Sequence, residues 1–202
     1  MNNETLNDET LKTRTRITAD EFYQSPEYAQ YDVIQLVDGE MVIGEGNDKD
    51  DIIPPILRHQ AIVVATIVFL SSYAKQQGGR VYTAPAEVYL DENNIYEPDV
   101  FYISPSPKCK REEKRVVGPP DLVVEVLSPS SIKRDRVTKY AAYERNGVRE
   151  YWLADPVYST VQVYVLGQDG SFQSHGLFMA DETFTSPCLN NQSVAVADLL
   201  AD

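Results

Sequence analysis

The stretch PDLVVEVLSPS, residues 120–130, decides the fold. Its centre is an almost continuous apolar run, which is typical of a strand in the middle of a sheet covered on both faces. Glu125 interrupts this run, and a buried carboxylate is costly unless it is paired, hydrogen-bonded or bound to a metal. The stretch therefore predicts a central strand that carries either a functional glutamate or one that is simply paired with an arginine.

The segment after this strand is predicted to be a helix over residues 131–145, which ends at the Asn-Gly pair 146–147. Asp135, Lys139 and Tyr143 recur every four residues and therefore share one face of that helix. One interpretation is an ordinary surface Asp–Lys pair beside a half-buried tyrosine. The functional interpretation places Lys139 over the end of the preceding strand, where a lysine can orient water and stabilise developing negative charge.

A second carboxylate, Asp99, follows Pro98 at the start of the strand-like run EPDVFYIS. Proline is tolerated at a strand start because a ladder N–H is not needed there, so Asp99 is expected at the mouth of the strand. A Pro-Asp pair is also common in turns. Two carboxylates from separate strands, with a lysine nearby, could bind a divalent metal and cut a phosphodiester.

Two further polar residues are candidates for supporting roles. His59 lies early in the longest predicted helix, residues 55–77, which begins with Pro55 and stops at the glycines 78–79. A hydrogen-bonded core histidine is the alternative there. Glu40 lies in the turn DGE, a strong hairpin signal, where a solvated turn residue is the alternative.

The rest of the chain reads as alternating helices and strands. Thr18 and Glu21 have the spacing of a capping box, so a short helix is expected there. The middle of the chain is predicted as helix, strand, strand, strand, helix, strand, with strands in RVYTAPAEVYL, NIYEPDVFYIS, DLVVEVL and REYWLADP. Residues 1–17 are polar and expected to fray, whereas residues 18–202 are predicted to form a single domain.

Composition excludes several classes. The chain of 202 residues is 43% hydrophobic and has only two cysteines, which argues against a disulfide framework and favours a reducing cytoplasm. The longest strongly apolar run, Ala61 to Leu70, falls short of the roughly 18 residues of a membrane span. The two histidines are far apart and no CxxC occurs, so any metal is expected to be a hard cation on oxygen ligands.

The charge is unevenly distributed along the chain. The net charge of −13 opposes nucleic-acid binding. However, residues 1–51 carry 13 acids and 4 bases, a net of −9, whereas residues 105–150 carry 11 bases and 7 acids, a net of +4. A local basic surface can hold an anion despite an acidic total, although it can also be a plain solvated face. The candidate substrate-binding residues in the loop before Glu125 are Lys108, Lys110, Arg111, Lys114 and Arg115.

Taken together, these motifs resemble the PD-(D/E)XK restriction-endonuclease-like superfamily and, within it, the Uma-two family of endonucleases. The matching segments are DGE at 38–40, His59, EPDV at 97–100, PPDLVVEVLSPS at 119–130, the face of Asp135, Lys139 and Tyr143, and NGVREYWLADP at 146–156.

The resemblance implies an α/β fold in which a central mixed sheet is flanked by the helices at 55–77 and 131–145. It also implies metal-dependent endonuclease activity, with DNA as the expected substrate, and Asp99 and Glu125 as ligands of Mg²⁺ or Mn²⁺. The superfamily pattern places a lysine two residues after the glutamate, where this chain has Leu127, so the resemblance implies that Lys139 takes over that role.

The residues that would contact and orient Asp99, Glu125 and Lys139 are then Glu40, His59, Asp135 and Tyr143. A homodimer is expected because duplex cleavage often uses two symmetric sites. A different class of function fits the same sequence, namely a non-catalytic module that keeps the fold and binds nucleic acid or protein. The acidic total and Leu127 favour this alternative, and retention of all three site residues favours the enzyme.

Overall fold

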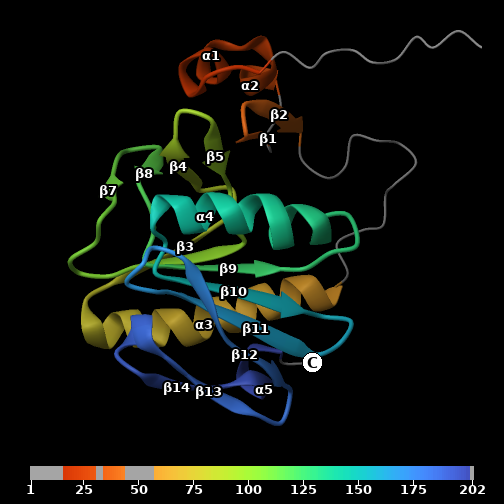
Figure 1. Ribbon diagram of the computed structural model, residues 1–202, viewed down its shortest axis with the longest axis vertical. Coiled ribbons are helices and arrows are strands. Elements are labelled where there is room, and N and C mark those ends of the chain that lie inside the picture. Colours follow the sequence, from red (N-terminus) through yellow and green to blue (C-terminus); the bar gives the residue numbers. More distant parts are fainter. Residues whose placement is uncertain (1–15, 31–33, 44–56, 201–202) are drawn as a thin grey trace, which may run out of the picture.

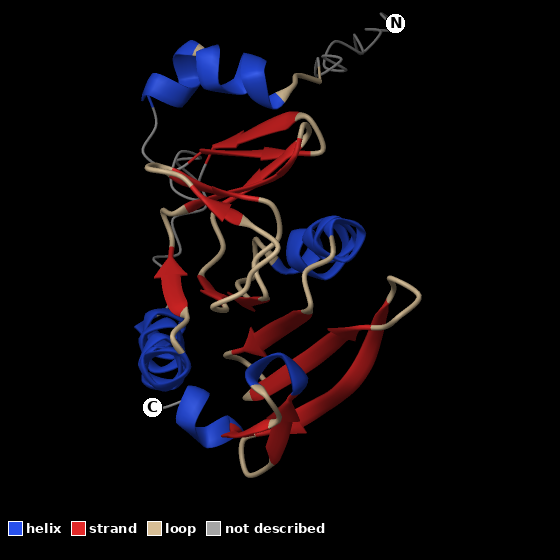
Figure 2. Ribbon diagram, turned by 90° about the vertical axis from the view of Figure 1, so that its left-hand side faces the viewer, coloured by secondary structure: helices blue, strands red, loops and turns tan. Residues whose placement is uncertain are grey.

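The computed structural model describes residues 16–30, 34–43 and 57–200, with two larger β-sheets lying one above the other (Figure 1 and Figure 2). The lower, central sheet contains, from edge to edge, β12 (Phe172–Met179), β11 (Thr160–Leu166), β10 (Glu150–Asp155), β9 (Leu122–Val126), β6 (Val100–Ile103) and β3 (Arg80–Thr83). The upper sheet contains β2 (Glu40–Ile43), β1 (Ile34–Val37), β5 (Asn94–Tyr96), β4 (Glu87–Asp91), β8 (Arg115–Val117) and β7 (Lys110–Arg111).

The remaining elements pack around these sheets. A small hairpin, β13 (Thr183–Ser186) and β14 (Gln192–Ala195), lies at the bottom. The helices are α1 (Ala19–Gln24), α2 (Pro26–Gln30), α3 (Leu57–Gln77), a π-helix η1 (Arg134–Lys139) that continues into α4 (Tyr140–Asn146), a 3₁₀ turn η2 (Pro187–Leu189), and α5 (Val196–Leu199).

The central sheet is mixed, as predicted. β9 and β10 are parallel, with Leu153 opposite Glu125, whereas the other neighbouring strands of this sheet are antiparallel. A parallel pair needs a crossover connection, which η1 and α4 supply. Figure 2 shows α3 on one face of the sheet and α4 on the other. All five residues of β9 are buried, so the predicted central strand and the α/β class are confirmed.

The two faces of this sheet form separate cores. Val124 and Trp152 pack with α3, whereas Val123 and Tyr151 pack with α4. Successive side chains of a strand point to opposite faces, so Glu125 shares the α4 face with Val123. The carboxylate of Glu125 is therefore reached from the α4 side of the sheet.

The strand prediction was wrong in one respect, because each of two predicted strands is divided into two shorter strands. RVYTAPAEVYL divides into β3 of the central sheet and β4 of the upper sheet, and NIYEPDVFYIS divides into β5 and β6 in the same way. Pro85 and Pro98 lie at the two divisions. Proline has no N–H for a ladder, which favours a change of sheet at these points. Asp99 thus stands where the chain re-enters the central sheet.

Several local predictions are confirmed. Thr18 and Glu21 form the capping box, and Asp38 and Gly39 have positive φ angles of 48° and 79° in the tight β1–β2 turn. The predicted helix at 131–145 is present, but its first part is wound as the π-helix η1, which is common at functional sites. Pro55 and most of the segment 1–17 lie outside the described residues, and a single domain over 18–202 stays a prediction.

By length and composition alone, α3 is the one helix in the described part of the chain that could cross a membrane. Core helices pass the same test, and one face of α3, with Ile62 and Leu70, packs against the central sheet. The expected cytoplasmic location therefore stays a prediction.

Candidate active site

Asp99 and Glu125 meet at one end of the central sheet. β6 and β9 are antiparallel neighbours with Val100 opposite Val124, so Asp99 falls beside Glu125. The backbone N–H of Asp99 donates to Glu125 Oε2 at 3.4 Å, and the N–H of Val126 donates to Asp99 Oδ2 at 2.7 Å. The structure thus brings the two predicted carboxylates together.

Lys139 reaches the same carboxylate from η1. Its Nζ lies 2.8 Å from Glu125 Oε1 and 3.1 Å from Asp135 Oδ1, and the hydroxyl of Tyr143 donates to Glu125 Oε1 at 2.9 Å. All four of these side chains are buried. The alternatives of a surface Asp–Lys pair and of a glutamate paired with an arginine are therefore wrong.

His59 closes the cluster from the opposite helix. Its Nε2 lies 3.4 Å from Asp99 Oδ2, and the side chains of His59 and Asp99 are 16% and 24% exposed. The side chains of Glu125 and Lys139 are only 3% and 5% exposed. Solvent thus reaches the cluster on the Asp99–His59 side, while the Lys139 side is closed by α4.

The electrostatics of the cluster are unbalanced. The ammonium group of Lys139 contacts the carboxylates of Glu125 and Asp135, and a third carboxylate, that of Asp99, lies beside Glu125. Burial raises the pKa of Glu125 above its ordinary value, Asp135 and Asp99 add to this, and Lys139 opposes it. Burial alone would lower the pKa of Lys139, but the three carboxylates outweigh it and raise that pKa, so the ammonium stays charged.

This donor set fits a hard divalent cation. A surplus of buried negative charge favours either a proton or a bound cation, and carboxylate oxygens are ligands that Mg²⁺ prefers. Within residues 16–30, 34–43 and 57–200, no three histidine, cysteine or acidic side chains form a metal-ligand group. Asp99 and Glu125 would therefore be the protein ligands, and water would complete the coordination, as is usual for Mg²⁺.

The remaining predicted residues lie elsewhere. Glu40 begins β2 in the upper sheet, where its supporting role stays a prediction. Arg115 stacks over the ring of Tyr23 at 4.7 Å, and Arg111 donates to the hydroxyl of Tyr82 at 3.3 Å.

Lys108 lines a cavity of about 350 Å³ together with Arg149. Arg149 directly precedes β10, whose first residue, Glu150, lies opposite Leu122 at the start of β9, so this cavity is at the other end of β9 from Glu125. Lys110 is exposed in β7, and Lys114 is exposed in the turn between β7 and β8. A substrate role for these five basic residues stays a prediction.

Sequence reasoning missed the basic residues that do lie at the site end of the sheet. Arg58, next to His59, donates to the carbonyl of Pro156 and to Ser159 Oγ. Arg136, on η1, lies 3.8 Å from Asp155. The signals were the adjacency of Arg58 to His59 and the run Lys-Arg-Asp-Arg before Lys139.

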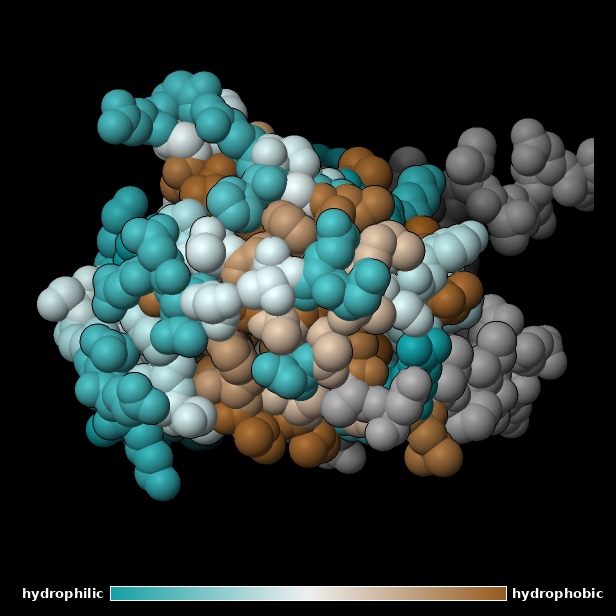
Figure 3. Space-filling model, turned by 90° about the horizontal axis from the view of Figure 1, so that it is seen from below, coloured by the Kyte–Doolittle hydropathy of each residue, from teal (hydrophilic) through white to brown (hydrophobic). Residues whose placement is uncertain are grey.

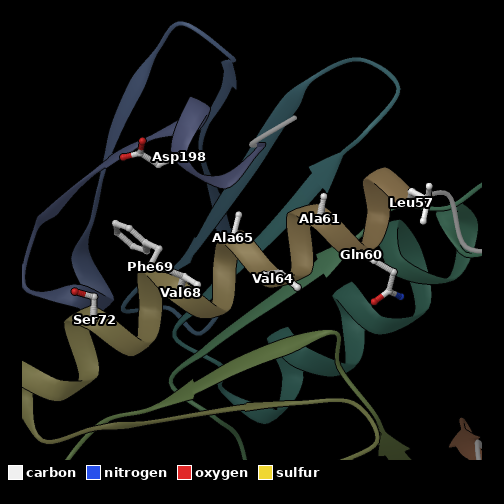
Figure 4. A pocket seen from close by; sticks show the side chains of 9 residues that line it. All are labelled: Leu57, Gln60, Ala61, Val64, Ala65, Val68, Phe69, Ser72 and Asp198. Atoms are coloured by element: carbon white, nitrogen blue, oxygen red, sulfur yellow. The ribbon is translucent and has the colours of Figure 1, made fainter.

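A groove on α3 lies apart from the carboxylate cluster. It has a volume of about 800 Å³ and lies on the outer face of α3 (Figure 4); its lining is Leu57, Gln60, Ala61, Val64, Ala65, Val68, Phe69, Ser72 and Asp198. Leu57, Val64 and Val68 are well exposed. Seen from below, apolar side chains gather along the lower rim of the molecule (Figure 3). None of the cluster residues contributes to this groove.

Comparison with known proteins identifies the family. Residues 19–197 match the family model Uma2, described as "Putative restriction endonuclease". No curated protein matches the chain. Among solved structures, a crystal structure titled as "a putative nuclease belonging to DUF820 from Anabaena variabilis" aligns with a TM-score of 0.69 at 21% identity, covering 92% of this chain and 98% of that one. The chain therefore belongs to the Uma2 family and has the restriction-endonuclease-like fold.

Proposed function

We propose that this protein is an endonuclease that uses Mg²⁺ or Mn²⁺ to hydrolyse phosphodiester bonds in DNA. The observation that carries the proposal is the meeting of Asp99, Glu125 and Lys139 at one strand end, with Lys139 Nζ 2.8 Å from Glu125. Membership of the Uma2 family supports hydrolysis of nucleic acid.

Asp99 and Glu125 are the residues that would hold the metal. When bound, such an ion polarises the phosphate and lowers the pKa of a coordinated water. Lys139 would offset the negative charge that develops on the phosphate, because its ammonium is kept charged in a site shielded from water. His59 and Tyr143 orient the two carboxylates, His59 at Asp99 Oδ2 and Tyr143 at Glu125 Oε1.

The departure at Leu127 has a structural reason. Leu127 is 4% exposed and packs in the core under α4, so a lysine there would be buried among apolar side chains. Lys139 approaches the same carboxylate from η1 and meets Asp135 one turn earlier. This geometry supports the view that the catalytic ammonium moved from the strand to the helix.

The test compares the wild type with Asp99→Asn, which keeps the shape of the side chain and the acceptor for Val126 N–H. We expect the variant to lose both Mg²⁺ binding in calorimetry and cleavage of DNA. Asp198→Asn, an acid in the groove on the far side of α3, serves as the matched control and should behave as wild type. Equal metal affinity in wild type and Asp99→Asn would refute the metal assignment.

The second candidate is a non-catalytic module that binds nucleic acid or protein, and the net charge of −13 favours it. The same assays separate the two, because this module would show binding without cleavage of DNA or RNA under any divalent metal. The expected homodimer is a separate proposal, relevant to a duplex substrate, and light scattering of the purified chain measures it.

A further inference from the structure

The turn between β10 and β11 presents an exposed aromatic side chain. Tyr158 is 72% exposed and its neighbour Val157 is 67% exposed. In the part of the chain that the structure describes, no other phenylalanine, tyrosine or tryptophan is exposed. Single exposed apolar residues are common, so exposure alone does not mark Tyr158 as a binding residue.

This turn is held firmly from two sides. The carboxylate of Asp155 accepts the backbone N–H groups of Val157 and Tyr158 at 3.0 and 3.1 Å. Arg58, from the first turn of α3, donates to the carbonyl of Pro156 and to Ser159 Oγ. A side chain carried on a fixed backbone loses less freedom when it binds a ligand.

The turn lies at the site end of the central sheet. Ala154, just before the turn, is opposite Val126, and Leu127 N–H donates to the carbonyl of Ala154 at 2.8 Å. Helix α3 also connects the turn to the carboxylate cluster. Arg58 donates a hydrogen bond to the turn, and the next residue of α3, His59, contacts Asp99. In Figure 1 the β10–β11 turn, the start of α3 and the end of β9 lie on the same side of the molecule.

Positive charge flanks the same edge. Lys133 is exposed just before η1, and the Arg136 side chain is 41% exposed. Arg136 meets Asp155 only at 3.8 Å, a loose contact that a phosphate group can replace. An exposed aromatic ring and exposed cations at one edge of a protein form the combination that holds single-stranded nucleic acid, with bases on the ring and phosphates on the cations.

We propose that the β10–β11 turn is a stacking platform on which Tyr158 binds an unpaired base of single-stranded nucleic acid, while Lys133 and Arg136 contact the neighbouring phosphates. This inference rests on the proposed nuclease function and specifies its substrate class. Bases inside a duplex are already stacked on each other, so a tyrosine on a surface turn reaches only an unpaired base.

The experiment measures binding of a short single-stranded DNA without divalent metal and at low salt, so that nothing is cleaved during the titration. Tyr158→Ser should weaken binding by about 5- to 150-fold, the value of one base–aromatic stack, and Tyr158→Phe should bind as wild type. Leu177→Ser, a change at another exposed apolar side chain on β12, is the control and should leave the affinity unchanged.

A direct reporter of stacking is available because the only tryptophan of the chain, Trp152, is fully buried. Tyr158→Trp adds an exposed indole whose fluorescence should be quenched by the single strand. Wild-type affinity in Tyr158→Ser, tighter binding of a duplex than of the single strand, or absence of any binding would each overturn the inference.

These outcomes are separate from those of the proposed function. Cleavage of DNA by the wild type together with unchanged binding by Tyr158→Ser removes the platform and leaves the nuclease. Stacking at Tyr158 without cleavage under Mg²⁺ or Mn²⁺ leaves the platform and removes the nuclease.

Discussion

Two glutamates buried in adjacent strands of the central sheet offer a comparison between its two ends. Glu125 of β9 is 2% exposed and Glu150 of β10 is 0% exposed. The strands are parallel, and Glu150 lies opposite Leu122, so the two carboxylates occupy opposite ends of the sheet. Both carboxylates are buried, so burial does not distinguish them. They differ in the groups that each carboxylate contacts.

Glu150 is satisfied by neutral donors. Its oxygens accept from Trp152 Nε1 at 2.7 Å, Ser186 Oγ at 2.9 Å and the N–H of Cys188 at 2.8 Å. These bonds join β10 to the segment at β13 and η2. A fully hydrogen-bonded carboxylate of this kind fixes the structure and leaves little capacity for a ligand.

Glu125 has a different kind of environment. Its partners are the ammonium of Lys139, a tyrosine hydroxyl and the N–H of Asp99, and the carboxylates of Asp99 and Asp135 lie close by. The cluster holds more negative than positive charge, and Asp99 leaves it open to solvent. Unbalanced charge with solvent access, more than burial, therefore distinguishes the candidate site from the structural network around Glu150.

The largest expected effect is on stability, at the structural glutamate. Glu150→Ala leaves three buried donors without an acceptor, so the free energy of unfolding should fall by roughly 3–5 kcal/mol. Urea unfolding followed by circular dichroism measures this. Cleavage per folded molecule should not change. A loss of cleavage in the folded variant would show that Glu150, like Glu125, contributes to activity.

The next effect is on activity, at the other end of the sheet. Lys139→Ala removes the ammonium that contacts Glu125, so the rate of cleavage should fall about 10²–10³-fold. Lys75→Ala, in the exposed last turn of α3, is the control and should cut at the wild-type rate. Equal rates in Lys139→Ala and wild type would show that Lys139 has no catalytic role.

Two hydroxyl deletions test whether the two glutamates differ in function. Tyr143→Phe and Ser186→Ala each remove one 2.9 Å hydrogen bond to a buried glutamate, and Ser186→Ala also removes the acceptor of the Leu189 N–H. Each should lower the free energy of unfolding by about 0.5–1.5 kcal/mol, and only Tyr143→Phe should also slow cleavage. If both variants or neither slow cleavage, the two glutamates do not differ in function.

The smallest effect is a change in the pH dependence of stability. Burial raises the pKa of Glu150, although the hydrogen bonds from Cys188, Trp152 and Ser186 oppose it. A group with a raised folded pKa stabilises the fold below its unfolded pKa, about 4.3, and loses this contribution as the pH rises through the folded pKa. The stability advantage of wild type over Glu150→Gln should therefore shrink with rising pH; an advantage that grows would contradict it.

The sequence was sufficient where the signal was local. The apolar run around Glu125 predicted the central strand, and the four-residue spacing of Asp135, Lys139 and Tyr143 predicted one face. It was insufficient where the partner is distant in sequence. REYWLADP reads as an ordinary strand, and nothing in it indicates that Glu150 binds Ser186, 36 residues later. The change of sheet at Pro85 and Pro98 was not predicted for the same reason, because strand patterns do not specify which sheet a strand joins.

The parallel pairing of β9 with β10 has a consequence for the order of synthesis. Asp99 and Glu125 leave the ribosome before Lys139, and β10, which completes the pairing of β9, ends only at Asp155. A nascent chain shorter than this carries both carboxylates but lacks the strand that fixes β9, and non-local strand pairing forms late. The carboxylate cluster is thus assembled only after the residues up to Asp155 have been translated. If the proposed nuclease function holds, a shorter, prematurely released fragment has no cluster with which to cut nucleic acid.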